Sequence, residues 1–296
     1  MLVALLFEPE FVRIYLSADG VLTPGQAAAL PAARLALGIF GAALLLLAGL
    51  LPRLAAMPGL ARLTAGRQGQ WLIFLTPPAL LIGLVGYKLL RGAGDPFYLL
   101  AVREDSLVEW LTALSYFGVF LVAGMLAIRL SLTRHHLLAA FFALIGVCGL
   151  FVALEEISYG QRLLGFATPP PVAAHNRQDE MTLHNLDLVE RLFFTLVPLA
   201  VGLFGLLGLV LAGMRRWLDG GALQMLSLLV PPWFLASWFV PVAVFALYAT
   251  FFWGELALVE WQDQEPLEGV LAFGFLAYVL RTLAQVRNKP LDTRAF

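Results

Sequence analysis

Long apolar segments alternate with short polar connections along most of the chain, a pattern typical of a polytopic membrane protein. A helix that crosses the hydrocarbon core of a bilayer needs about 20 mostly apolar residues. Seven segments meet this requirement, at about residues 33–52, 71–90, 107–128, 137–157, 191–213, 228–252 and 267–283. The pattern therefore predicts an all-α fold, a membrane helix bundle of about seven transmembrane helices.

We expect residues 1–296 to form a single membrane domain. The first residues, "MLVALLFEPEF", lack the basic start and the small-residue cleavage site of a signal peptide, so we interpret residues 1–30 as an interfacial segment. Residues 158–190 are too polar to span the membrane and form a long connection. Gly202, Gly205 and Gly208 recur every three residues in the fifth span, and small residues of this kind predict close helix packing.

Composition agrees with this interpretation. The 296 residues are 60% hydrophobic and 13% charged, whereas soluble domains carry roughly 25% charged residues. A net charge of −1 and the absence of a Lys/Arg run argue against nucleic-acid binding. The single cysteine, Cys148, excludes an intrachain disulfide and a cysteine-based zinc site. From its general character we expect the protein in a bacterial inner (cytoplasmic) membrane, in contact with membrane lipids.

Basic residues predict the orientation, because Lys and Arg concentrate in cytoplasmic connections. With the N-terminus outside and the C-terminus cytoplasmic, eleven of the nineteen basic residues lie on the inner side. The same topology leaves eighteen of the twenty acidic residues outside. Acidic residues contribute little to the orientation rule, so this excess indicates a specialised outer face.

Three outer connections hold most of the polar residues. They are "REDSLVEW" at 103–110, the connection from "EEISYGQR" at 155–162 to "HNRQDEMTLHN" at 175–185, and "GELALVEWQDQEPLEG" at 254–269. Glu109 is predicted about one turn inside its span, and a similar pattern recurs before the last span at Glu265 and Glu268. Carboxylates at the edge of the membrane are costly, which makes them functional candidates.

The adjacent Glu155 and Glu156 are about 100° apart on a helix, so they cannot face the same partner. An ion pair of Glu155 with Arg162 or Arg103 would explain one of them by structure alone. The other remains a candidate for function. The predicted catalytic residues are Glu109, Glu155, Glu156, Glu180 and His184, and those predicted to orient a substrate are Gln161, Arg162, Asn176, Gln178 and Asn185.

Two kinds of site fit these residues. Carboxylates with an imidazole are a ligand set for a divalent metal, with Glu109, Glu156, Glu180 and His184 as ligands, and Mn, Fe(II), Zn, Mg and Ca all stay open. No HExxH or comparable metal motif supports this choice. The alternative is a metal-free site in which a buried glutamate and His184 exchange protons.

The blocks "EDSLVEWLTAL", "EEISYGQRLLGFATP" and "HNRQDEMTLHN" resemble a family of bacterial polytopic membrane proteins. That family carries variants of Glu-Glu-Ile-Ser-(Trp/Tyr)-Gly-Gln-Arg followed by Asn-x-Gln-x-Glu-x-x-Leu-His-Asn. The resemblance covers roughly residues 100–190 and implies that the blocks form one constellation. It implies no activity, because none is assigned to the family.

Three functions are compatible with this pattern. The first is an enzyme with an outer-face site for a lipid or lipid-linked substrate. The second is a non-catalytic subunit or assembly factor that docks a protein partner through its outer loops. A transporter agrees less well, because the inner half of the spans has almost no ionisable residues to form a path.

Overall fold

The computed structural model describes most of the chain after residue 65. The described residues are 66–102, 106–161, 168–173, 175–176, 182–183, 189, 192–214, 217–218, 220–252 and 259–288. Every regular element among them is a helix, which confirms the all-α prediction for this part of the chain. The predicted interfacial segment 1–30 and the predicted span 33–52 lie outside the described residues.

Six stretches of the described chain are long and apolar enough to cross a membrane, as expected of a multi-pass membrane protein. The longer helices are α5 (Arg67–Arg91), α7 (Leu107–Leu132), α8 (His136–Glu156), α11 (Val197–Met214), α12 (Gly220–Leu229), α13 (Ala236–Phe251) and α14 (Glu265–Asn288). The shorter elements are α6 (Pro96–Val102), α10 (Pro170–Ala173), η1 (Ser158–Gly160), η2 (Leu192–Leu196), η3 (Trp233–Leu235) and η4 (Trp261–Gln264).

The two proline pairs have different consequences. Pro77 and Pro78 lie inside the continuous helix α5. The candidate span Leu223–Phe251 is broken into α12, η3 and α13, and the predicted span 228–252 takes in only the last two residues of α12. Its break falls at the second pair, where Pro232 has extended backbone angles (φ −64°, ψ 153°) and, like any proline, has no N–H for a helical hydrogen bond.

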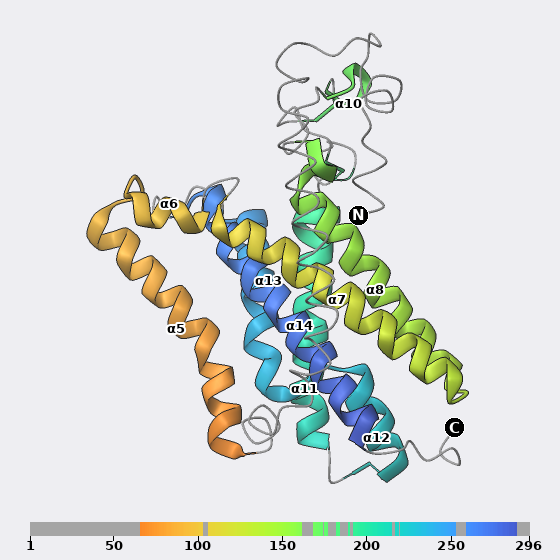
Figure 1. The fold of residues 1–296 in the computed structure, drawn as a ribbon. Helices are drawn as coiled ribbons and strands as arrows, with labels where there is room; N and C mark the ends of the chain where they lie inside the picture. The colour runs from red at the N-terminus through yellow and green to blue at the C-terminus, as the bar shows by residue number, and fades with distance from the viewer. Residues whose placement is uncertain are drawn as a thin grey trace.

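Consecutive candidate spans run in alternating directions, with α12 and α13 as two parts of one crossing (Figure 1). One end of the bundle therefore collects the end of α5, α6, the start of α7, the end of α8 and the start of α14. All acidic residues of the described part belong to this end, which we call the polar end: Asp95, Glu109, Glu155, Glu156, Glu260, Asp263, Glu265 and Glu268.

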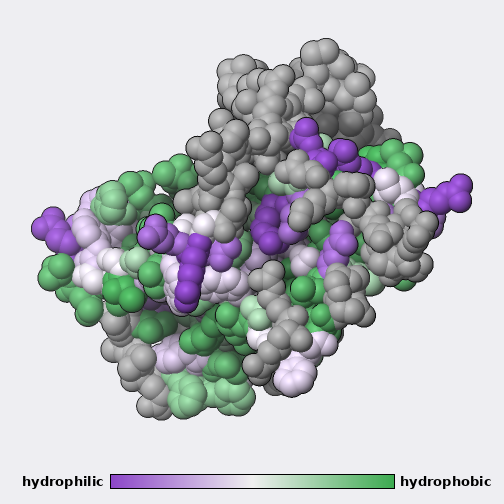
Figure 2. Space-filling model, turned by 90° about the horizontal axis from the view of Figure 1, so that it is seen from below, coloured by the Kyte–Doolittle hydropathy of each residue, from purple (hydrophilic) through white to green (hydrophobic). Residues whose placement is uncertain are grey.

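The opposite end of the bundle is basic. Figure 2 views the molecule from that side and shows hydrophilic side chains among hydrophobic ones. The exposed arginines there are Arg67, Arg129, Arg134 and Arg287. The described acidic residues thus all lie at one end of the bundle, where Lys88 and Arg91 of α5 are the basic residues paired with some of them.

Close packing holds α7, α8 and α14 together beneath the polar end. A Cβ atom built on Gly149 of α8 would lie 3.0 Å from the carbonyl oxygen of Tyr116 in α7, so these two helices approach closely. The core between the helices includes Val122, Leu126, Phe142 and Tyr278, all fully buried. The ends of α7, α8 and α14 are consequently fixed relative to one another.

The glycines of α11 confirm the predicted close packing. Cβ atoms built on Gly202 and Gly205 would lie 2.3 Å from the Cβ atoms of Ala243 and Phe239 in α13. A Cβ atom on Gly208 would collide with the carbonyl oxygen of Pro231. Only glycine permits this contact, because any side chain would push α11 and α13 apart.

Candidate carboxylate site

Three glutamates from two helices converge at the polar end. Glu156 is the last residue of α8, and Glu265 and Glu268 lie in the first turn of α14. One carboxylate oxygen of each lies within 4.8 Å of the corresponding oxygens of the other two, and all three side chains are partly buried. We call these three residues the carboxylate cluster.

A left-handed turn ends α8 immediately after Glu156. Ser158, Tyr159 and Gly160 have φ angles of 46°, 51° and 82°, and the N–H of Gly160 donates to the carbonyl oxygen of Ile157 at 2.7 Å. This conformation suits glycine but costs roughly 1–2 kcal/mol for a residue with a Cβ atom. The helix therefore cannot continue past Ile157, and Glu156 stays at its end.

The other two carboxylates are placed by the start of α14. Glu265 and Glu268 are three residues apart and so share one face of the helix. Gly269 lets α7 come close to this face, since a Cβ atom there would lie 3.0 Å from Cγ1 of Val108 and 3.3 Å from Oγ1 of Thr112. The first turns of α7 and α14 thus form two sides of one small region.

The helix dipoles favour two glutamates of the carboxylate cluster and disfavour the third. The positive end of α14 favours Glu265 and Glu268, by about 0.3–1 kcal/mol for a residue near the surface. Glu156 lies at the negative end of α8, where an acidic side chain is disfavoured. An ordinary helix-start preference therefore explains the two residues of α14 but not Glu156.

Among the described residues, the charges that act on Glu156 are all acidic. Its carboxyl group is within electrostatic range of those of Glu268, Glu265, Glu109 and Glu155, and it makes no hydrogen bond or ion pair with any described residue. Two full charges 4.8 Å apart repel by about 3–4 kcal/mol at an effective dielectric constant of about 20. A proton or a cation next to Glu156 would relieve this repulsion.

Glu155 has a different role from its neighbour. It is buried, and its Oε2 accepts a hydrogen bond from the N–H of Leu183 at 2.8 Å. Burial and a hydrogen bond to the Glu155 carboxylate raise the pKa of Tyr159 well above its usual range. Glu155 therefore attaches the long connection 158–190 to the end of α8.

The predicted site residue Glu109 lies in the first turn of α7. Its N–H is capped by Oγ of Ser106 at 3.3 Å, which starts the helix, and its carboxyl group is within electrostatic range of Glu156. The structure thus brings Glu109 near the carboxylate cluster from a third helix.

Two predicted substrate-orienting residues make contacts within the connection 158–190. Nδ2 of Asn176 donates to the carbonyl oxygen of Thr182 at 2.9 Å, and Nε2 of Gln161 donates to Oγ1 of Thr168 at 2.7 Å. The remaining predicted residues lie outside the described part of the chain, so their roles stay predictions: Arg162, Gln178, Glu180, His184 and Asn185.

Sequence reasoning did not include Glu265 and Glu268 in the site. A signal was present, because two carboxylates three residues apart precede the last span in the same way that Glu109 begins the third. What the sequence could not indicate is that the start of α14 lies against the end of α8, which is a consequence of helix packing.

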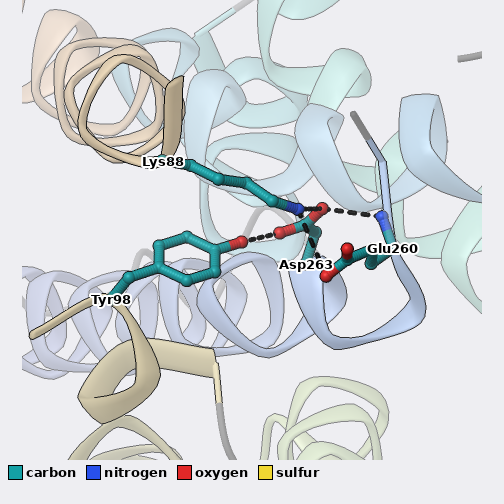
Figure 3. Close-up of polar contacts among 4 residues, drawn as sticks. All are labelled: Lys88, Tyr98, Glu260 and Asp263. Atoms are coloured by element: carbon teal, nitrogen blue, oxygen red, sulfur yellow. Dashed lines mark hydrogen bonds and ion pairs between the residues drawn. The ribbon is translucent and has the colours of Figure 1, made fainter. Parts of the chain in front are cut away.

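A second polar cluster lies beside the first and was also not predicted (Figure 3). Nζ of Lys88, at the end of α5, lies 2.8 Å from Oδ2 of Asp263 and 3.5 Å from Oε2 of Glu260. The hydroxyl of Tyr98 donates to the other oxygen of Asp263, and Nζ lies 5.3 Å from the centre of the Tyr98 ring. We call Lys88, Tyr98, Glu260 and Asp263 the lysine cluster.

The lysine cluster satisfies its own charges. Lys88 is buried, and a buried ammonium group is tolerated when it is paired and hydrogen-bonded. Oδ2 of Asp263 also accepts from the N–H of Glu260 at 2.8 Å, which caps η4 just before α14. The cluster therefore joins α5 and α6 to the start of α14.

Comparison with known proteins assigns neither a family nor a function to the chain. No protein-family model, curated protein or solved structure matches the chain. The functional conclusion therefore depends on the geometry of the carboxylate cluster.

Proposed function

We propose that this protein is a membrane-embedded enzyme that acts on a lipid or lipid-linked substrate, with the carboxylate cluster as its site. One observation carries the proposal. Glu156 converges with Glu265 and Glu268 to within 4.8 Å, at a helix end that disfavours an acidic residue, and the charges around it are acidic.

A divalent cation is the proposed partner of these carboxylates. Glu156, Glu265 and Glu268 each offer an oxygen ligand, and Glu109 of α7 lies outside this group but within electrostatic range of Glu156. Glu180 and His184 are further ligands proposed from the sequence. A bound divalent cation would supply Lewis-acid chemistry or an activated water.

The position of the cluster motivates the substrate class. It lies at the ends of helices that are long and apolar enough to span the membrane, where the headgroup of a lipid is within reach. With the polar end outward, the site faces the outer side of a bacterial inner membrane. The family of polytopic proteins that the sequence resembles is, on this proposal, a family with the same site.

The alternative chemistry uses the same residues without a metal. Glutamates this close together share a proton, and one of them can then act as a general acid and the other as a general base. The two mechanisms differ in a measurable way, because only the first requires a divalent cation.

Contacts in the long connection favour a second candidate function. Glu155 and Asn176 hold residues 182–183 in place beside the polar end. A connection held against the bundle in this way would suit a non-catalytic subunit that docks a protein partner. Such a subunit has no need of a cation at Glu156.

Calorimetric titration of the purified protein in lipid nanodiscs with Mn²⁺, Mg²⁺, Ca²⁺ and Zn²⁺ tests the metal site. We expect one cation to bind and Glu156→Gln to abolish binding. Glu260→Gln is the matched control, because this carboxylate lies at the same end but pairs with Lys88. If no divalent cation binds, the metal-dependent mechanism is wrong. If Glu156→Gln also leaves turnover of extracted lipids unchanged, the enzyme proposal is wrong.

A further inference from the structure

Helix α5 is attached to the bundle near two residues, and the stretch between them is largely exposed. Pro77 and Lys88 are the buried residues among the 25 of this helix. Between them, Ile82 is 71% exposed, and a Cβ atom built on Gly83 or Gly86 would have no described atom within 4 Å. The position of α5 therefore depends mainly on its two attachments.

The first attachment lies just before the proline pair. Ile73 and Phe74 are the residues of α5 that pack against the described hydrophobic core. Pro77 has no N–H, so the carbonyl oxygen of Ile73 lacks its usual partner in the helix, and Nε1 of Trp238 in α13 donates to it at 3.0 Å. Sharp bends in helices occur mostly at prolines. The proline pair is therefore a hinge directly beyond a fixed segment.

The second attachment is the carboxylate of Asp263 in η4 (Figure 3). Its Oδ2 lies 2.8 Å from Nζ of Lys88 at the end of α5, and its other oxygen accepts a hydrogen bond from the hydroxyl of Tyr98 in α6. One side chain thus holds two helices, and it lies two residues before Glu265 of the carboxylate cluster.

The end of α5 and α6 are joined into one unit by Asp95. This carboxylate accepts hydrogen bonds from the hydroxyl of Tyr87 and from the N–H of Phe97, both at 2.9 Å. It also pairs with Nε of Arg91 at 3.3 Å. Because these contacts connect both sides of the turn, we expect the end of α5 and α6 to move together.

Helix α6 lies beside the proposed site. It contacts both α7 and α14, whose first turns carry Glu109, Glu265 and Glu268. Figure 1 shows α6 crossing the polar end from α5 to the start of α7. A movement of α6 away from the bundle would consequently uncover the helix starts that carry these carboxylates.

We infer that residues 79–102, the outer part of α5 with α6, form a lid that pivots at Pro77 and Pro78, is latched by Asp263, and opens to admit a lipid headgroup to the carboxylate cluster. The movement is independent of the proposed function, whereas the role of the lid rests on it. The carboxylates are partly buried and a lipid keeps its chains in the bilayer, so its headgroup has to enter between helix ends. Lids of this kind commonly control access to active sites.

Distances between two nitroxide labels, measured by pulsed electron paramagnetic resonance in nanodiscs, test the movement. Cys148 is the single cysteine of the chain, so a Cys148→Ser protein takes labels only at introduced cysteines. The lid pair joins Leu90, beyond the prolines, to Val147 of α8, and the reference pair joins Leu72, before the prolines, to Val147. All three labelled positions are exposed.

Weakening the latch should act on the lid pair alone. Tyr98→Phe keeps the ring and removes one of the two ties to Asp263, so we expect the population of a second lid-pair distance to rise about twofold to tenfold, as for the loss of one hydrogen bond. The reference pair should keep one distance. Tyr278→Phe is the matched control, because its buried hydroxyl donates to the carbonyl oxygen of Leu228 in the core. It should change neither pair.

Two further measurements address the hinge. In the wild-type protein, which needs no stable variant, the lid pair should already give a broader distance distribution than the reference pair. Replacing both prolines, Pro77→Ala with Pro78→Ala, returns two hydrogen-bond donors to α5 and should narrow the lid-pair distribution. The lid is overturned if both pairs respond alike to Tyr98→Phe, or if the lid pair responds to neither the latch nor the hinge variant.

Turnover of extracted lipids separates the lid from the site. A change of turnover in Tyr98→Phe, with none in Tyr278→Phe, would support the role of the lid. If Tyr98→Phe moves the lid pair at wild-type turnover while Glu156→Gln abolishes turnover, the lid does not serve the site and its role is overturned. If Glu156→Gln leaves turnover unchanged, the proposed function fails and the measured movement stands.

Discussion

The carboxylate cluster and the lysine cluster lie side by side at the start of α14, yet their charges are balanced in different ways. Asp263 of the lysine cluster pairs with Lys88, accepts from Tyr98 and caps the N–H of Glu260. Two residues further on, Glu265 meets Glu156 and Glu268. The lysine cluster pairs opposite charges and links helices, whereas the carboxylate cluster brings together like charges.

This contrast separates carboxylates with a structural role from those proposed to be functional better than position does. Both clusters contain acidic residues near a helix start at the polar end of the bundle, so both fit the same sequence pattern. Glu155 and Glu156 repeat the contrast between neighbours, because Glu155 accepts a backbone N–H while the charges around Glu156 are acidic. The partners of each carboxylate, and not its place in the sequence, distinguish the two roles.

Breaking the lysine cluster should have the largest effect on stability. Lys88→Met leaves Asp263 without its ion-pair partner, and the loss of one member of a buried pair costs about 3–5 kcal/mol. The measurement is the thermal unfolding temperature in detergent. Arg91→Met is the control on the same helix, because its pair with Asp95 is at the surface, where solvent screens it, and should contribute little. Equal effects of the two variants would contradict the structural role of Lys88.

Removing divalent cations should come next in size. A cation that binds only the folded protein stabilises it by about 2.7 kcal/mol at a hundred times its Kd. We therefore expect a chelator to lower the unfolding temperature of the wild-type protein and to leave Glu156→Gln unaffected. An identical chelator effect on both proteins would locate the cation elsewhere.

Neutral amide substitutions should act in opposite directions in the two clusters. Without divalent cations, Glu156→Gln removes repulsion and should stabilise the protein by about 1–3 kcal/mol. Asp263→Asn removes an attraction and should destabilise it. The comparison uses chemical or thermal unfolding of both variants under the same chelating conditions. Destabilisation by both would mean that Glu156 has a cationic partner in the protein itself.

We expect the smallest effect on stability from a change at Tyr159, which lies three residues after Glu156. Tyr159→Phe removes the hydroxyl whose pKa burial and the Glu155 carboxylate raise, so it should have only a small effect on stability and none on cation affinity. Unfolding and Mn²⁺ titration measure the two quantities separately. A large loss of affinity would show that Glu155 shares the function of Glu156.

Much of the fold follows from sequence because the membrane restricts the possibilities. Apolar stretches of sufficient length predicted all six described candidate spans, and small residues predicted close packing of α11, although not that α13 is its partner. The places where helices break were harder to predict from the sequence. Pro231 and Pro232 separate α12 from η3, whereas Pro77 and Pro78 leave α5 continuous, and the neighbouring helices decide such outcomes.

The sequence by itself determined that this is a helical, multi-pass protein and that Glu109, Glu155 and Glu156 are unusual, because a carboxylate at the end of an apolar helix is costly wherever that helix packs. Only the tertiary structure decided their partners. In the folded protein, Glu156 lies beside Glu265 and Glu268, and Glu155 accepts a hydrogen bond from the N–H of Leu183. Asp263 pairs with Lys88, which is 175 residues away in the sequence. Hydropathy depends on each segment alone, whereas charge pairing depends on which helix ends meet.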